Sequence, residues 1–363
     1  MTTDTVEFKY SKRSSRWKLI LLALIVALIA AIIFCLNIGY APINFSDILT
    51  ILGKQIPFLN GSINSSSVST VNQAIILQIR LPRIFAGAIV GAGLAAAGVM
   101  YQGVFRNPMA DSYLLGASAG ASLGYTLTAI YAGSLALTFL GLGVFQAIAF
   151  IGAVLTVFLV YFMSRVGNKV PVTTLLLSGI VVNIFILALQ TVFELRSGKA
   201  LIGIVAWIAG GFSNITWLDI YAVFPFVLIG IVLAYFFTKD LNMLSMGDDT
   251  AQHLGVNTER VRQILLLISS LITGAVVSIS GVIGFVGLII PHMTRLVIGP
   301  DHRILLPTSA IVGAIFLILC DSLARVATGA SELPVGVITA LAGTPFFIYL
   351  LRPARTRRRP AAD

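Results

Sequence analysis

Charged side chains are scarce in this sequence. Its 363 residues include 24 basic and 14 acidic ones, so only 10% of the chain is charged, compared with about 25% in an average soluble domain. From Gln263 to Thr294 there is no Asp, Glu, Lys or Arg at all. This shortage, with a hydrophobic fraction of 58%, excludes an ordinary soluble domain and predicts an integral membrane protein. The alternating pattern of barrel strands is missing too, so the apolar runs must cross the bilayer as helices.

Residues that bind metals or nucleotides are also few. The two cysteines, Cys35 and Cys320, lie inside apolar runs, where we expect small buried side chains rather than a disulfide or a metal site. The three histidines show no ligand spacing, and we expect His292 to be a helix-end residue. The sequence has no Gly-x-x-x-x-Gly-Lys-Ser/Thr loop for binding phosphates. We therefore expect no metal, no cofactor and no enzymatic activity in this chain.

The predicted membrane centre has no charged residue, although ion-coupled transporters usually have one there. Asp321, toward the outer end of the ninth predicted helix, comes closest. We therefore expect the driving energy to come from elsewhere. An ion-coupled secondary transporter using Asp321 is one alternative. A receptor or scaffold without transport activity is another, and it predicts that substitutions in the inner loops are harmless.

The apolar runs predict about ten transmembrane helices in one polytopic all-α domain. Runs long enough to cross roughly 30 Å of hydrocarbon recur along the whole chain. The first, Trp17 to Gly39, is interpreted as a retained helix rather than a signal peptide. The uncharged stretch is divided near Ser280 to Gly287, leaving a short eighth helix. The predicted centres are Leu28, Leu94, Ser122, Val154, Phe185, Leu228, Leu271, Ile290, Phe316 and Phe346.

The basic residues predict the orientation of these helices. Ten crossings place both termini on one side, and if that side is the cytoplasm, 18 of the 24 Lys and Arg residues are cytoplasmic. The chain then consists of a basic cytoplasmic head (1–16), a transmembrane domain (17–351) and a basic cytoplasmic tail (352–363) of a plasma (inner) membrane protein. The net charge of +10 thus reflects topology, and we expect contact with membrane lipid but not with nucleic acid.

Three segments carry enough polar sequence to act outside the bilayer. The outer loop 40–79 contains an amphipathic piece, NFSDILTILG, and a Ser/Asn-rich stretch, NGSINSSSVST, which we interpret as a spacer rather than a lid. The inner loop 239–262 is the longest cytoplasmic connection. The third segment is the outer loop 324–336.

Glycines at spacings of four predict close helix packing. Small residues let helices approach in lipid, where hydrophobicity gives little drive to pair. Gly116, Gly120 and Gly124 are expected on one face of the third helix, and Gly87 and Gly91 repeat the pattern in the second. They would serve mainly as packing surfaces, with a smooth wall for a bulky solute as the alternative. The preceding RNPMAD is predicted to be a tight inner turn, with Asp111 or Ser112 capping the third helix.

Five blocks in order resemble the FecCD-type permeases, the membrane subunits of ABC importers for iron-siderophores, haem and cobalamin. The blocks are RLPR (80–83), RNPMADSYLLGASAGASLG (106–124), GDDTAQHLGVN (247–257), GFVGLIIPHMTRLVIGPDHR (284–303) and ELPVGVITALAGTPFFIYLL (332–351). The resemblance implies the type II ABC importer permease fold. In that fold, helices two to five and seven to ten form two inverted four-helix units, and two copies enclose the path.

The resemblance also assigns roles to named residues. It implies that two short cytoplasmic helices within 245–261 dock on an ATPase dimer that carries ATP and magnesium. Their coupling surface would comprise Gly247, Asp248, Ala251, His253, Leu254 and Gly255. From the residues alone, Asp248 is expected to cap the first short helix, Gly255 to end it, and Asn257 or Thr258 to cap the second.

On the outer face the resemblance implies that Arg80, Arg83 and Arg325 meet glutamates of an extracytoplasmic substrate-binding protein. The alternative for RLPR is an anchor at the lipid headgroups. The expected function is ATP-driven import of a metal chelate by a homodimeric permease. An iron-siderophore is favoured as cargo, with cobalamin and haem as alternatives. Met100, Tyr101 and His292 suit contact with a porphyrin and packing equally well.

Overall fold

The fold is described from a computed structural model that covers residues 3–55, 69–132, 138–139, 142–167, 170–328 and 332–351. Within these residues the chain is mostly helical, with one short strand pair, β1 (Thr138–Phe139) and β2 (Leu142–Gly143). The long helices are α1 (Thr3–Asn37), α4 (Leu81–Phe105), α5 (Ala117–Tyr131), α6 (Val144–Ser164), α7 (Val172–Glu194), α9 (Trp217–Phe236), α12 (Thr258–Ser280), α13 (Val286–Ile298), α14 (His302–Val326) and α15 (Val335–Leu351). The short ones are α2 (Phe45–Lys54), α3 (Thr70–Ala74), the π-helical η1 (Ile75–Arg80), the 3₁₀ turn η2 (Gly198–Ala200), α8 (Leu201–Ile208), α10 (Thr238–Leu244) and α11 (Asp248–His253).

The predicted all-α membrane fold is confirmed. Each of the ten predicted centres falls inside one of the ten long helices. Within the described residues, seven helices are long and apolar enough to cross a bilayer, while α5, α13 and α15 are shorter. The predicted break in the uncharged stretch is also present, because α12 ends at Ser280 and α13 begins at Val286.

Three local predictions were wrong. The third helix begins at Ala117, not after Asp111 or Ser112, and Gly116 precedes it with a φ of +81°. Asp111 instead accepts a hydrogen bond from the backbone N–H of Ser112 at 2.6 Å. Asp248 is the first residue of α11 rather than its cap, because ion pairs engage its carboxylate. The second short helix expected within 245–261 is the first part of α12, which Asn257 caps as predicted.

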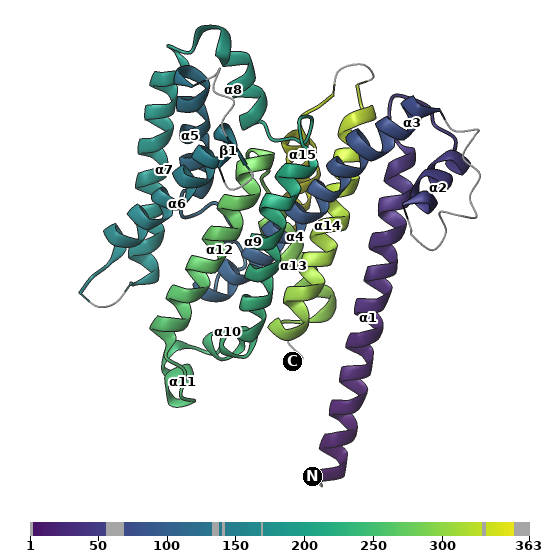
Figure 1. Ribbon diagram of the computed structural model, residues 1–363. Coiled ribbons are helices and arrows are strands. Elements are labelled where there is room, and N and C mark those ends of the chain that lie inside the picture. Colours follow the sequence, from purple (N-terminus) through teal and green to yellow (C-terminus); the bar gives the residue numbers. More distant parts are fainter. Residues whose placement is uncertain are drawn as a thin grey trace, which may run out of the picture.

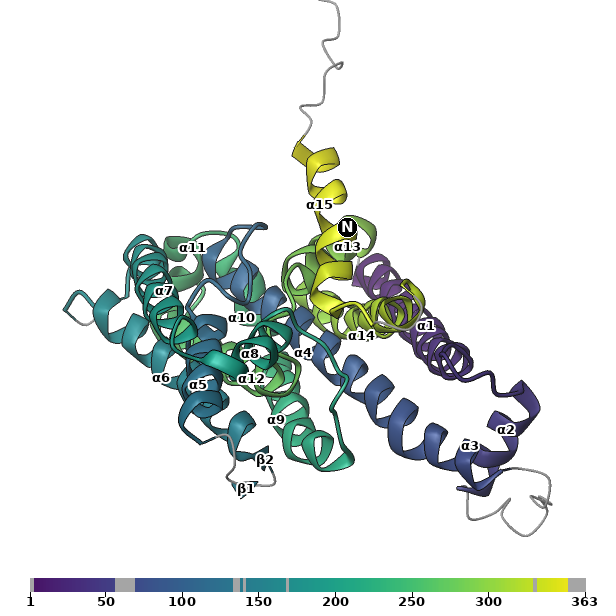
Figure 2. The ribbon, with the colours of Figure 1, turned by 90° about the horizontal axis from the view of Figure 1, so that it is seen from above.

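The bundle has two ends that differ in content. Figure 1 shows α10, α11 and the start of α1 at one end, called here the α11 end, and α2, α3 and α8 at the other, called the α2 end. In the view along the bundle, α4 runs obliquely across the middle, from α3 at the edge toward α10 (Figure 2). It packs against α9, α12, α13 and α14. Almost the whole length of α4 is buried, so this helix forms the core around which the others are arranged.

The amphipathic piece of the first outer loop forms α2. Its Ile48 and Ile51 are buried in a small separate core with Cys35, Leu36 and Ile76. Most of the predicted Ser/Asn-rich spacer lies outside the described residues. Part of the first outer loop is therefore a helix, α2, that packs on the end of α1.

Helices α4 to α7 and α12 to α15 are the two four-helix units, and each contains a break at the same place. In both, the first helix is followed by non-helical chain and a shortened second helix, through 106–116 in one unit and 281–285 in the other. The breaks contact each other. Tyr113 Oη donates to the carbonyl oxygen of Ile283 at 2.9 Å and accepts from its N–H at 3.1 Å. Irregular backbone at membrane depth must be satisfied by protein, and this tyrosine satisfies both groups.

Candidate functional site

The predicted coupling surface is a short helix held rigidly at one end of the bundle. Gly255, with a φ of +86°, ends α11, and the N–H of Val256 donates to the carbonyl of Ala251 at 3.0 Å. This is a Schellman arrangement, in which a left-handed glycine lets the chain satisfy the last carbonyls of a helix. Ala251 and Val256 are buried under the turn, whereas His253, Leu254 and Gly255 are exposed.

Two exposed apolar side chains flank α11, whose own exposed residues are polar. The Leu254 side chain is 58% exposed and the nearby Met246 is 68% exposed, both outside the transmembrane helices. Exposed apolar residues on both sides of a short helix outside the membrane favour a protein contact. The α11 surface can therefore receive another protein.

Asp248 connects α11 to two transmembrane helices. Its carboxylate pairs with Arg106, at the end of α4, and with Arg262, on the first turns of α12, at 3.1 Å. Arg262 is almost fully buried and also lies 3.6 Å from Glu259. Arg106, Asp248, Glu259 and Arg262 form what we call the α11-end cluster.

The same cluster reaches the connection between α6 and α7. Glu259 Oε1 accepts the backbone N–H of Val170 at 3.0 Å. A groove of ≈ 520 Å³ lies here, lined by Phe105, Arg106, Val170, Pro171, Val172, Thr173, Asp248, Glu259 and Arg262. A displacement of α11 would therefore act on α4, on α12 and on the α6–α7 connection together.

A second set of polar contacts fixes α10 to α14 at this end. Asn242 Nδ2 donates to Asp301 at 2.9 Å, and its oxygen accepts the backbone N–H of His302 at 2.9 Å. Burial alone raises the pKa of Asp301, but hydrogen bonds from Arg303 and Asn242 outweigh it and hold the pKa below its ordinary value. The guanidinium of Arg303 also lies 5.4 Å from the ring centre of Trp17, which brings the start of the apolar part of α1 to the same end.

The predicted docking arginines lie at the α2 end, but they are buried. Arg80, Arg83 and Arg325 have relative exposures of 4%, 6% and 7%. Arg83 pairs with Asp321 at 2.8 Å and with Glu332 at 2.7 Å, and Arg325 pairs with Asp321 at 3.3 Å. These five residues are called the α2-end cluster. Only Glu332, whose side chain is 41% exposed, offers the cluster a clear route to solvent.

Two of these arginines hold the end of α1. Arg80 donates to the carbonyl of Leu36 at 2.7 Å and to that of Ala41, while Arg325 donates to the carbonyl of Ile38 at 3.2 Å. The last carbonyls of a helix have no partner within the helix. In the conformation described, these guanidiniums therefore satisfy backbone groups inside the chain, and their docking role stays a prediction.

The predicted packing glycines lie at close helix contacts, with two exceptions. A Cβ built on Gly91 would overlap the carbonyl of Gly313 in α14, and one on Gly120 would overlap that of Gly152 in α6. Gly124 approaches Ile148 in the same way. Gly87 makes only ordinary contact with Ile318, and Gly116 lies before α5 rather than in it.

The residues considered for porphyrin contact are placed differently from one another. Met100 and Tyr101 are fully buried, and Tyr101 Oη lies 2.9 Å from Ser270 Oγ, so both are packing residues here. His292 is half-buried beside the ring of Phe346 on α15. Among the residues that the structure describes, no group of three His, Cys, Asp or Glu side chains is placed to hold a metal ion. Cys35 and Cys320 are buried and unbridged.

Sequence reasoning missed the acidic and basic partners that complete both clusters. Asp321 and Arg325 are four residues apart on one helix, a spacing that indicates a pair, and this signal could have connected them. Arg106 and Arg262 gave no such signal, because their partner Asp248 lies far from Arg106 in the sequence. The short helix α10 was also not predicted.

Comparisons with known proteins agree with this architecture. The chain matches the FecCD transport family over residues 15–353. The cobalamin import system permease protein BtuC of Halobacterium salinarum is 44% identical over 285 residues, covering 78% of this chain and 75% of that protein. The hemin transport system permease protein HmuU of Yersinia pestis is 38% identical over 283 residues, covering 78% and 84%. A solved structure described as an inward-facing conformation of a metal-chelate type ABC transporter has a TM-score of 0.75 and 30% identity, covering 92% of this chain and 99% of that one.

Proposed function

Because this chain belongs to the FecCD transport family, we propose that it is the permease subunit of an ABC importer that moves a metal chelate across the plasma membrane. The family match over residues 15–353 is the observation that carries the proposal. It is supported by the likeness to a metal-chelate type transporter over 92% of the chain. Energy would come from ATP and magnesium on a separate ATPase dimer, so the permease itself is not an enzyme.

The proposed assembly contains two copies of this chain, the ATPase dimer and an extracytoplasmic binding protein. Both termini and the α11 end face the cytoplasm in this proposal, because that orientation places 18 of the 24 basic residues inside. The ATPase then contacts the face formed by Gly247, Asp248, Ala251, His253, Leu254 and Gly255. The exposed Leu254 is its apolar anchor.

The α11-end cluster gives this contact a mechanical consequence. When the ATPase dimer closes on ATP, the two copies of α11 are displaced, and Asp248 transmits this to α4 and α12 through Arg106 and Arg262. The break at 106–116 directly follows α4, and the break at 281–285 directly follows α12. Transport is then alternating access between two states that ATP and the loaded binding protein favour differently.

The binding protein is proposed to dock at the α2 end. The burial of Arg80, Arg83 and Arg325 supports a role in shaping that surface from beneath. A partner carboxylate would reach Arg83 by replacing Glu332, the exposed member of its ion pairs. While no partner is bound, Arg83 keeps its ion pairs with Asp321 and Glu332.

The cargo is proposed from the names of similar permeases rather than from a binding pocket in this chain. Relatives named for cobalamin, hemin and Fe(3+)-citrate import are all similar to this chain. An iron chelate is the expectation from the breadth of the family. Cobalamin is the second candidate. It is supported by sequence identity, because the cobalamin permease of Halobacterium salinarum is 44% identical to this chain, compared with 37% for the Fe(3+)-citrate permease of Bacillus subtilis.

The test is uptake into proteoliposomes that contain the permease, its ATPase and its binding protein. Ferric siderophore, haem and cobalamin are compared with and without ATP. We expect one of them to accumulate only with ATP, and a His253→Glu plus Leu254→Glu variant to abolish this uptake. Leu195→Glu, which adds charge to a residue that is 83% exposed and lies outside α11, is the matched control. Uptake without ATP would instead favour the secondary transporter.

A further inference from the structure

A wedge on the membrane face of the bundle lies between α6 and α9, with α12 at its base. The two outer helices meet through Phe150 and Phe226, whose ring centres are 5.6 Å apart. Beyond this contact, toward the α11 end, α12 presents a ridge of partly exposed residues, Ile264, Leu267 and Leu271. A cavity lies on each side of the ridge, and Leu271 lines both.

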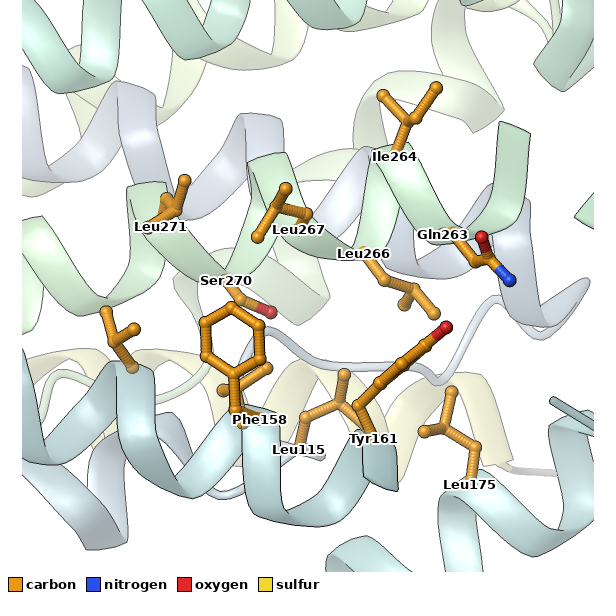
Figure 3. Close-up of a pocket in the computed structure, with 12 residues that line it drawn as sticks. Leu115, Phe158, Tyr161, Leu175, Gln263, Ile264, Leu266, Leu267, Ser270 and Leu271 are labelled. Atoms are coloured by element: carbon orange, nitrogen blue, oxygen red, sulfur yellow. The ribbon is translucent and has the colours of Figure 1, made fainter. Parts of the chain in front are cut away.

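The two cavities match in size and are both apolar. The cavity on the α6 side has a volume of ≈ 310 Å³, and Figure 3 shows the rings of Phe158 and Tyr161 rising from α6 toward Leu266, Leu267 and Ser270 of α12. The cavity on the α9 side is also ≈ 310 Å³ and is lined by Phe226, Ile229 and Leu233 among others. Paired apolar cavities separated by one ridge suit the two acyl chains of a single lipid.

The height of the cavities corresponds to one leaflet of the bilayer. The α12 residues that line the α6-side cavity run from Gln263 to Leu271, an axial distance of eight residues or about 12 Å at 1.5 Å per residue. From Pro225 to Leu233 the α9 side also spans eight residues. One leaflet contributes about 15 Å of hydrocarbon. The wedge thus accommodates chains from the leaflet at the α11 end and stops near the membrane centre.

Polar and basic residues continue the cavity faces at the level of the headgroups. Arg260 precedes Ile264 by four residues on the same face of α12. Arg165 is the extended residue that follows α6 on the side of Tyr161, and its Nε donates to the carbonyl of Gly167 at 2.9 Å. Both arginines are exposed, and Gln263 lines the cavity on the same side as Tyr161. Two guanidiniums above a pair of apolar cavities provide charge complementarity for a phosphate headgroup.

We propose that this wedge binds one anionic phospholipid of the cytoplasmic leaflet, with an acyl chain on each side of the ridge and its phosphate near Arg165 and Arg260. The leaflet assignment rests on the proposed orientation of the permease. A lipid held here would fill the space beside α12, the helix that receives the motion of α11 through Arg262.

The test measures lipids retained by the full chain with native mass spectrometry. The protein is extracted from bilayers of equal phosphatidylglycerol and phosphatidylcholine and washed with excess detergent. We expect one phosphatidylglycerol to remain bound in preference to phosphatidylcholine. Leu267→Trp, which extends the ridge into the cavity on the α6 side, should remove the retained lipid.

Arg260→Gln leaves the apolar cavities unchanged. It should lower the ratio of phosphatidylglycerol to phosphatidylcholine about fivefold, the factor expected for one basic residue at an anionic surface. Leu22→Trp and Arg16→Gln, exposed positions of α1, are the controls and should change nothing.

Three results would overturn the proposal. One is lipid retention that is equal in all variants. Another is retention without preference for the anionic headgroup. The third is a Leu267→Trp variant that keeps its lipid but loses a second copy of the chain, which would make the wedge a protein interface. Because the measurement needs neither cargo nor ATP, its failure is distinguishable from failure of the proposed import activity.

Discussion

The two ends of the bundle both carry a cluster of ion pairs, but the two clusters are built differently. In the α2-end cluster, Arg83 and Asp321 have side-chain exposures of 7% and 1%. In the α11-end cluster Arg262 is also buried, but the shared carboxylate, Asp248, is 39% exposed and pairs with Arg106, which is 36% exposed. Removing one member of a buried pair leaves an uncompensated charge, whereas exposed pairs add little to stability. The α2-end cluster is therefore suited to hold helices in place, and the α11-end cluster to transmit motion.

The largest effect is expected from Asp321→Asn, which removes the buried carboxylate of the α2-end cluster. It leaves Arg83 and Arg325 without their shared carboxylate, so we expect the free energy of unfolding to fall by about 3–5 kcal/mol. Chemical unfolding in detergent measures this. Glu332→Gln, at the exposed edge of the same cluster, is the control and should cost about 1 kcal/mol or less. Equal effects of the two variants would contradict the assignment of the buried pair as structural.

A smaller loss is expected from Gly91→Ala, which tests whether the α2-end cluster depends on close helix approach. Gly91 of α4 faces Gly313 of α14, and these helices carry Arg83 and Asp321. The added methyl group would push them apart and cost about 1–3 kcal/mol. Gly203→Ala is the control, because no atom lies within 4 Å of a Cβ at that position. A Gly91→Ala protein as stable as the control would show that the two helices can separate freely.

Arg106→Glu is expected to change transport more than stability. It places a second carboxylate beside Asp248 and breaks a half-exposed ion pair, so the loss of stability should be about 1 kcal/mol or less. ATP-driven uptake should fall about fivefold or more, the range of a typical coupling free energy, while ATP hydrolysis continues. Parallel assays of hydrolysis and uptake in proteoliposomes separate the two effects.

A charge exchange provides the control for this prediction. Combining Arg106→Glu with Asp248→Arg restores an opposite pair between α4 and α11, although Arg262 then faces a like charge. We expect partial recovery of uptake. If uptake is unaffected by Arg106→Glu alone, Asp248 does not act through α4.

The smallest effect is expected from Asp301→Ala at the α11 end. Asp301 caps α14 by accepting the N–H of Arg303 at 3.1 Å, and losing such a cap costs about 1 kcal/mol. Because its pKa is lowered in the folded protein, its stabilising contribution is complete above the unfolded pKa of about 3.9 and is lost only as pH falls below that. Unfolding of wild type and variant at pH 7 and below pH 4 checks both statements. A difference that grows on acidification would contradict them.

Much of the fold was predictable because helices in a bilayer obey a simple rule. Long apolar runs must satisfy their own backbone, so their centres can be read from composition, and all ten centres fall in helices. The short eighth helix was predictable as well, since the uncharged stretch is too short for two full crossings. The helix starts around Asp111 and Asp248 were not, because each carboxylate has a neighbour that competes with the cap.

The candidate surfaces were only partly predictable. Exposure of His253 and Leu254 follows from their position before a glycine that ends a short helix. The burial of Arg80, Arg83 and Arg325 does not follow from the local sequence, because their partners are distant in the chain. Arg80 contacts the end of α1, and Arg83 pairs with Asp321 of α14 and with Glu332. An arginine near a predicted helix end looks the same whether it faces water or another helix.

The sequence by itself determined that this chain is a helical membrane protein, where its helices lie and which family it resembles. These properties depend on composition and on the order of motifs along the chain. Only the tertiary structure decided which charges are paired, that Arg106 and Asp248 join two segments far apart in the sequence, and that two breaks meet at Tyr113 and Ile283. The physical reason is that burial and ion pairing depend on distances in space, which the packing of α4 against its neighbours sets.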